Sequence, residues 1–179
     1  MLAAGMTLLL VGVGVLAVAL FSAVGPGRHG DPPEAPVPAA AAPGQARTVT
    51  YRILPAGGRP LTVRLEVAAD PAARARGLMG REGVPPGNGM VFLYPTDVRE
   101  SFWMKDTLVP RSIAFVAADG RVVSVAEMTP CRADPCPTYA PAGPYRYAVE
   151  LTAGAFPAAG VGAGDRVVPE DSASLPEPS

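Results

Sequence analysis

The residues with the most distinctive chemistry include the chain's only tryptophan and only lysine, Trp103 and Lys105, and the adjacent Asp106. In an extended strand, residues two apart point to the same side, which would place Trp103 and Lys105 on one face. A desolvated lysine can act as a base or nucleophile. An aromatic ring beside a cation can instead bind a sugar or a carboxylate. The spacing therefore suggests a ligand-contacting face.

Glu150 interrupts the otherwise apolar run 147–151. One interpretation is an exposed or edge carboxylate. The other makes it the ion-pair partner or acid/base mate of Lys105, with Arg111 as an alternative partner for the glutamate. Lys105 could equally pair with Asp106 or Glu100. We therefore name no catalytic residue and take a set of candidate ligand-binding residues: Trp103, Lys105, Asp106 and Glu150.

Several kinds of chemistry are excluded by scarcity. The only histidine, His29, precedes the foldable region, so that region cannot supply Ser-His-Asp or Cys-His catalysis or a multi-histidine metal site. No phosphate-binding glycine loop is present. The thioethers of Met79, Met90 and Met104 suit Cu(I), but each lies in an apolar block, which favours core packing. We expect no metal and no cofactor.

Cys131 and Cys136 are separated by four residues, Arg-Ala-Asp-Pro. An even, closely spaced pair in an exported domain is most simply a disulfide. A redox or metal pair is the alternative, but the spacing exceeds that of a redox C-x-x-C motif. We expect a structural disulfide that holds the Pro-rich loop 129–144.

The N-terminal residues 1–24 carry no charged side chain and are long enough to cross a membrane as a helix. They indicate a signal-anchor or transmembrane helix; the alternative is a cleaved signal peptide, although a basic n-region is missing. Residues 25–46 are a Pro/Ala-rich linker. Either way, we expect the remainder outside the cytoplasm, attached to the cell membrane or, after cleavage, secreted.

Gly and Pro make up 42 of the 179 residues, 20 and 22 respectively, which argues against a mostly helical chain. Alternating runs predict hairpins over 48–67 and 112–125, and Asp70-Pro71 predicts a helix reaching about Met79. Further strands are expected at 89–94, 101–104, 145–151 and 164–168. We therefore expect a mostly β domain over 47–169, a jelly-roll-like β-sandwich or compact barrel with one or two short helices, before a disordered tail, 170–179.

Several blocks occur in an order that resembles the family known as domain of unknown function 192 (DUF 192): Gly77-Leu78-Met79, Gly89-Met90-Val91-Phe92, Phe102-Trp103-Met104-Lys105, and Ala148 to Gly154. The resemblance covers about 61–168. It implies a small, mostly β, jelly-roll-like domain that is often exported in bacteria, with no established activity. The chain departs from the family pattern at Asp106, where Asn is usual, and at Arg111, where Leu is usual.

The leading functional hypothesis is a membrane-tethered extracytoplasmic domain that binds a small ligand or an envelope partner without catalysis. The alternatives are a small hydrolase or lyase using Lys105 and Glu150, and a purely structural envelope domain. The net charge of −1 gives no reason to expect a nucleic-acid partner. A concave site holding Trp103, Lys105 and an acid would favour binding or catalysis; a shallow polar surface would favour the structural role.

Overall fold

The computed structural model describes residues 47–170, and the expected N-terminal helix, linker and most of the tail lie outside these residues. Within the described part, no helix is both long and apolar enough to cross a membrane. The chain forms mostly strands with two short helices. The elements are β1 (Thr48–Leu54), β2 (Leu61–Ala68), α1 (Pro71–Arg76), β3 (Asn88–Val98), β4 (Phe102–Trp103), β5 (Arg111–Val116), β6 (Val122–Met128), β7 (Thr138–Tyr139), β8 (Tyr145–Thr152), α2 (Ala155–Ala158) and β9 (Arg166–Pro169).

A 7-stranded sheet with the order β6-β5-β8-β3-β2-β1-β9 carries the domain, and β4 pairs with β7 in a separate ribbon. The sheet curls into a half-barrel, and its edge strands approach each other through backbone hydrogen bonds. The Val167 amide donates to the Gly120 carbonyl at 2.8 Å, and the Val122 amide donates to the Asp165 carbonyl at 2.7 Å. The sheet therefore has an inner concave face and an outer face.

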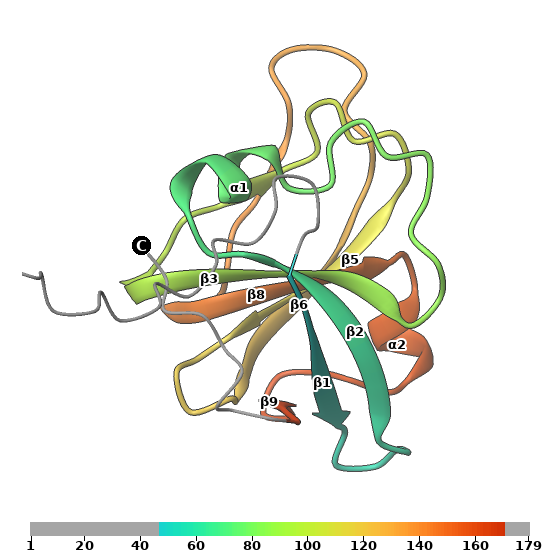
Figure 1. Cartoon of the computed structure of the whole chain (residues 1–179), viewed down its shortest axis with the longest axis vertical. Coiled ribbons are helices and arrows are strands. Elements are labelled where there is room, and N and C mark those ends of the chain that lie inside the picture. The colour runs from blue at the N-terminus through green and yellow to red at the C-terminus, as the bar shows by residue number, and fades with distance from the viewer. Residues whose placement is uncertain (1–46, 171–179) are drawn as a thin grey trace, which may run out of the picture. The chain divides into compact units, whose positions relative to one another are not determined.

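All neighbouring strands of this sheet are antiparallel except β2 and β3. Parallel neighbours need a crossover connection. Here that connection contains α1 and the loop after it, which cross one side of the β3–β8 region while β1 and β9 curl away on the other side (Figure 1). The crossover thus places α1 over the outer face of the sheet.

Period-two alternation divides the apolar side chains between the two faces. The inner face holds a core that includes Tyr51, Ile53, Leu65, Val149 and Phe156. The outer face holds a second core beneath α1 and β4, which includes Met90, Phe92, Met104, Phe115 and Tyr145. The central strands β3, β5 and β8 are consequently covered on both sides.

Both predicted hairpins are present, as β1–β2 and β5–β6. The predicted cap is also present: the Asp70 carboxylate accepts from the Ala73 amide at 2.8 Å. The helix is shorter than predicted, because Gly77 adopts φ +48 and ends it after Arg76. Strand β3 is longer than predicted. It continues past Pro95, which has no amide N–H to donate. The pairing with β8 is interrupted between Leu93 and Val98, so no ladder hydrogen bond is lost at the proline.

Candidate functional site

A cavity of about 310 Å³ opens on the outer face of the sheet. Its walls come from α1, the segment that follows α1, β3, and the β4 region, and its lining side chains include the aromatic residues Phe92, Tyr94, Phe102 and Trp103. Glu150 on β8 also lines it. The volume lies at the lower end of the range for small-molecule sites, roughly 300–1,000 Å³. This cavity is the candidate ligand site.

The aromatic walls are held by edge-to-face packing. The Phe92 and Phe102 rings are 4.9 Å apart at 87°, and Phe102 also packs against Phe115 at 5.7 Å. Tyr94 packs edge-on against Tyr145 at 5.4 Å. Such pairs stabilise by about 0.5–1.5 kcal/mol beyond their buried area. The inner wall of the cavity is therefore built into the outer core, while Trp103 remains 52% exposed beside it.

The cavity lining includes basic side chains from α1. Arg74 and Arg76 both line it. The Arg74 guanidinium lies 5.0 Å from the centre of the Tyr94 ring, and its Nη1 donates to the Leu93 carbonyl at 2.9 Å. The Glu100 carboxylate lies on the same lining. The helix thus brings two cations, at (i, i+2), to a cavity whose other charged groups are acids.

Glu150 is buried, with only 5% of its surface exposed, because it sits on β8 between β3 and β5 rather than at an edge. The interpretation of Glu150 as an exposed or edge carboxylate is therefore wrong. Burial raises the pKa of Glu150 to about 7, although the positive charge of Arg111 acts in the opposite direction. Near neutral pH this side chain exchanges between a carboxylic acid and a carboxylate.

Arg111 is the largest fully buried side chain of the described region, with 1% of its surface exposed. It lies on β5 opposite Thr152, so it is a diagonal neighbour of Glu150, which lies opposite Ile113. Its Nε and Nη2 atoms are buried and have no hydrogen-bond partner. Burial lowers the Arg111 pKa, Glu150 raises it, and Arg81 lowers it further. Arg111 and Glu150 thus influence each other's charge, but the described residues show no ion pair between them, so the expected pairing is not formed.

An ion pair lies near Arg111 and Glu150. Arg81, in the loop after α1, binds Glu66 on β2 through two bonds, and the Nη2–Oε2 distance is 2.7 Å. This contact lowers the Glu66 pKa and raises that of Arg81. Glu66 lies opposite Met90, which in turn lies opposite Glu150. Arg81, Glu66, Glu150 and Arg111 therefore form a charged cluster on the outer face. Glu66 and Glu150 lie on either side of Met90 in one row, and Arg111 is diagonal to Glu150.

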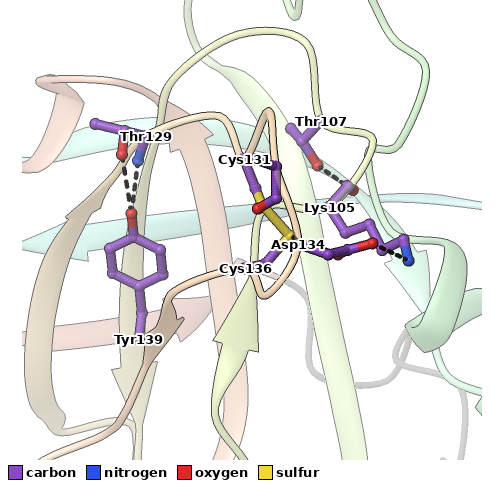
Figure 2. The surroundings of a disulfide bond; sticks show 8 residues. Lys105, Thr107, Thr129, Cys131, Asp134, Cys136 and Tyr139 are labelled. Carbon is purple, nitrogen blue, oxygen red and sulfur yellow. Dashed lines mark hydrogen bonds and ion pairs between the residues drawn. A yellow bond between two sulfur atoms is a disulfide. The ribbon is translucent and has the colours of Figure 1, made fainter.

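Lys105 lies elsewhere. Its Nζ is 3.6 Å from Oδ2 of Asp134 (Figure 2); the Lys105 side chain is partly exposed and that of Asp134 largely exposed. The partner is therefore Asp134 rather than Asp106, Glu100 or Glu150. Neither Lys105 nor Asp106 is among the residues that line the cavity. Of the candidate ligand-binding residues, the structure brings Trp103 and Glu150 to one cavity and leaves Lys105 and Asp106 outside it.

Trp103 and Lys105 were expected to lie on one face of a continuous strand, but the strand ends before Lys105. Strand β4 ends at Trp103, and a turn follows in which the Thr107 amide donates to the Met104 carbonyl at 3.2 Å. Asp106 has φ +52 within this turn. Met104 is buried in the outer core, as its apolar block predicts. The turn then directs Lys105 toward the 131–136 loop.

The two cysteine sulfur atoms are bonded at 2.12 Å, which supports the predicted disulfide (Figure 2). The Cys131 amide donates to the Met104 carbonyl at 3.2 Å, so the loop closed by the disulfide is joined directly to the segment after β4. Tyr139 on β7 accepts a hydrogen bond from the Thr129 amide at 2.9 Å. The disulfide loop consequently supports the β4–β7 ribbon that carries Trp103.

Sequence reasoning missed the aromatic wall and the burial of Arg111. Phe92 and Phe102 stood in the blocks that carry the family resemblance, but nothing in a single sequence distinguishes a cavity wall from a core position. Arg111 did give a signal, since a lone arginine followed by the apolar run 113–116 is unusual in a strand. Among the described residues no cluster of His, Cys, Asp and Glu could hold a metal ion.

Fold and site together define a small, mostly β domain with a half-barrel sheet and a charged cluster beside an aromatic cavity. The chain belongs to the DUF192 family, described as uncharacterized ACR, whose model matches residues 52–169. No curated protein matches the sequence.

Solved structures with the same fold exist. A proposed transcription regulator from Sinorhizobium meliloti 1021 is 31% identical, with a TM-score of 0.63, over 69% of this chain and 95% of that one. A protein of unknown function from Novosphingobium aromaticivorans DSM 12444 is 29% identical, with a TM-score of 0.63, over 75% of this chain and 94% of that one. Neither description assigns a ligand.

Proposed function

We propose that this protein is an extracytoplasmic binding domain that takes a small organic ligand into the cavity between α1 and β4. The observation that carries the proposal is the combination of aromatic walls with a buried carboxyl group, that of Glu150, in a cavity of about 310 Å³. Aromatic side chains combined with polar groups that fix the orientation of a ligand are common in small-molecule sites, and here the polar groups also include Arg74, Arg76 and Glu100. Binding rather than catalysis is favoured because Lys105 does not line the cavity with Glu150.

Trp103 provides a direct test, since it is the only tryptophan of the chain and lines the cavity. A ligand that enters the cavity should shift or quench its fluorescence, because the ring exchanges water for ligand atoms. We would screen a fragment library by Trp103 emission and confirm each binder by NMR titration. Binders should perturb the amides of 74–79 and 101–103 most strongly.

The matched control uses two alanines of the same short helix. Ala75 is exposed and lines the cavity, whereas Ala72 is exposed and does not. We expect Ala75→Phe to fill the mouth and weaken binding at least tenfold, and Ala72→Phe to leave it unchanged. If both variants bind fragments like the parent protein, or if no fragment perturbs Trp103, this cavity is not a ligand site.

The cellular location is part of the proposal. The uncharged residues 1–24, followed by the Pro/Ala-rich linker 25–46, support an N-terminal membrane anchor with the domain outside the cytoplasm. Protease treatment of intact cells should then remove the domain, and fractionation should retain the chain with the membrane. A protein found in the soluble cytoplasmic fraction would contradict this proposal, and recovery from the medium would indicate cleavage and secretion.

The description of the Sinorhizobium relative as a proposed transcription regulator raises the question of whether this chain binds nucleic acid. For this chain, a net charge of −1 does not support it, since nucleic-acid binding depends on an excess of basic side chains. The cavity is the more specific feature, and the small-ligand proposal rests on it.

A further inference from the structure

We propose that the ligand of this cavity carries a single carboxylate group, which Glu150 binds as a hydrogen-bond donor while Arg111 compensates the negative charge. This inference rests on the proposed function and names the class of ligand. It begins from the buried pair on β5 and β8. Arg111 and Glu150 are diagonal neighbours on one face of the sheet, 1% and 5% exposed, yet within 47–170 they form no ion pair at 4.0 Å or less.

Burying a charge is costly unless it is paired and hydrogen-bonded. Arg111 meets neither condition fully, because its Nε and Nη2 atoms are buried and have no partner. An arginine guanidinium does not lose its proton in a protein, so it cannot escape the cost by becoming neutral. A fixed positive charge with unused donors therefore lies outside the cavity lining, next to a glutamate that belongs to it.

The charges around Glu150 favour an anion over a cation. The groups that surround it or share its cavity are Arg111 on β5, Arg74 and Arg76 on α1, Arg81 on the following loop, Glu66 on β2, and Glu100. Four positive and two negative charges leave an excess of two when Glu150 is protonated and of one when it is ionised. Arg81 and Glu66 already neutralise each other. A ligand cation would be repelled, whereas a monoanion would be attracted.

Glu150 decides the kind of anion. A carboxylic acid has one O–H to donate, and a ligand carboxylate is a natural acceptor for it. The aromatic side chains of the lining suit an organic body attached to that carboxylate. A free inorganic phosphate has no apolar part to occupy them. We therefore expect a ligand with an apolar or aromatic body and one carboxylate at its inner end.

Because Glu150 must hold its proton to donate, binding should be coupled to proton uptake. The pKa of Glu150 in the free protein is about 7. A carboxylate ligand remains ionised from pH 6 to pH 8, so Glu150 is the group that changes. Its neutral fraction falls about tenfold between pH 6 and pH 8, and the affinity should fall by the same factor.

The experiment uses benzoate as the probe, with benzamide as its uncharged counterpart and inorganic phosphate as an anion without an apolar body. Each is titrated into the described domain within the full-length chain, in detergent, by calorimetry and by NMR at pH 6 and pH 8. We expect saturable benzoate binding that weakens about tenfold at pH 8. Benzamide and phosphate should bind at least tenfold more weakly than benzoate at pH 6.

Two variants separate the roles of the pair. Glu150→Gln keeps a donor and should bind benzoate with no difference between pH 6 and pH 8. Arg111→Met replaces the charge by an apolar chain of similar length. Glu150 can then take up a proton instead of remaining a buried, uncompensated anion, and the variant should weaken benzoate binding at least tenfold. Circular dichroism and thermal melts establish that both variants are folded.

Several results would overturn the inference. One is that Arg111→Met binds benzoate with the parental affinity. Another is that benzamide or phosphate binds as tightly as benzoate does. A third is that benzoate shows no saturable binding at millimolar concentrations. If uncharged fragments still bind and Ala75→Phe still blocks them, the cavity remains a ligand site and only its preference for a carboxylate is wrong. If no fragment binds either, the proposed function itself fails.

Discussion

Arg111 and Glu150 lie diagonally across β5 and β8, both buried on the outer face of the sheet, and Glu150 alone of the two lines the cavity. Their mutual attraction is not strong enough to keep the carboxyl ionised, since burial raises the Glu150 pKa to about 7 despite the neighbouring cation. A pair held apart in this way is a weak contributor to stability.

The first prediction concerns stability and pH. The Glu150 pKa rises from 4.5 to about 7 on folding, so the unfolded chain releases this proton at lower pH than the folded one. The contribution of Glu150 to the free energy of unfolding is therefore most favourable below pH 4.5. It decreases by about 3 kcal/mol in total as the pH rises to 7. Glu150→Gln should match the parent protein at low pH and exceed it at pH 8.

Urea unfolding at pH 4.5 and pH 8 measures this difference. Glu82→Gln is the matched control, because Glu82 is exposed on the loop after α1 and its neutralisation removes no buried charge. If Glu150→Gln and Glu82→Gln change stability identically at both pH values, Glu150 does not titrate as a buried acid.

A second prediction addresses the pair itself. Arg111 lowers the Glu150 pKa, so Arg111→Met should raise that pKa above 7. Carbon-13 NMR of the Glu150 carboxyl gives the titration directly. Arg121→Met, at an exposed arginine on the β5–β6 turn, should leave it unchanged. An unaltered Glu150 titration in Arg111→Met would show that the two charges do not interact.

Local patterns were sufficient to predict the hairpins, the Asp70 cap and the disulfide, because each depends on residues close together in sequence. The burial of Glu150 depends on strand order. Strand β8 lies between β3 and β5, which are distant from it along the chain, and a single sequence does not specify that arrangement. Alternation placed Glu150 with Ala148 on one face correctly, but it could not tell whether that face was covered.

Lys105 shows a second limit of sequence patterns. Alternation from Trp103 assumed a continuous strand, whereas the Met104–Thr107 turn ends it. The partner of Lys105, Asp134, comes from a loop whose position depends on the disulfide and on the Cys131–Met104 hydrogen bond. Such a partner is fixed by tertiary structure rather than by spacing.

The third prediction concerns the disulfide. The loop between Cys131 and Cys136 is short, and the chain-entropy model assigns its closure about 2 kcal/mol. Because the loop is bonded to the segment after β4, reduction should also loosen the ribbon that carries Trp103. We expect a lower melting temperature and a Trp103 emission shifted to longer wavelength. Cys131→Ser/Cys136→Ser should reproduce both effects and be insensitive to reductant; unchanged emission on reduction would show that the loop does not support the ribbon.

A fourth prediction tests the contact between β3 and β8. Gly89 packs so closely on β8 that an added Cβ would lie 2.0 Å from the Glu150 carbonyl oxygen, which is backbone and cannot move alone. Gly89→Ala should therefore destabilise the domain by about 3 kcal/mol or more. Gly83→Ala is the control, because nothing lies within 4 Å of its Cβ position. Equal melting temperatures for the two variants would contradict this packing.

The final prediction separates the core from the surface at neighbouring positions. Met104 is 1% exposed in the outer core, so Met104→Ala should cost about 2–5 kcal/mol, the usual range for truncating a buried methionine. The Lys105 and Asp134 side chains are 43% and 74% exposed, and an ion pair in water contributes little, so Lys105→Ala should cost less than about 1 kcal/mol. Since Lys105 does not line the cavity, its variant should also bind benzoate as the parent protein does.

Urea unfolding and calorimetry on both variants measure these effects. A large loss of stability in Lys105→Ala would show that the lysine supports the fold. Loss of benzoate binding in a folded Lys105→Ala variant would show that Lys105 belongs to the ligand site.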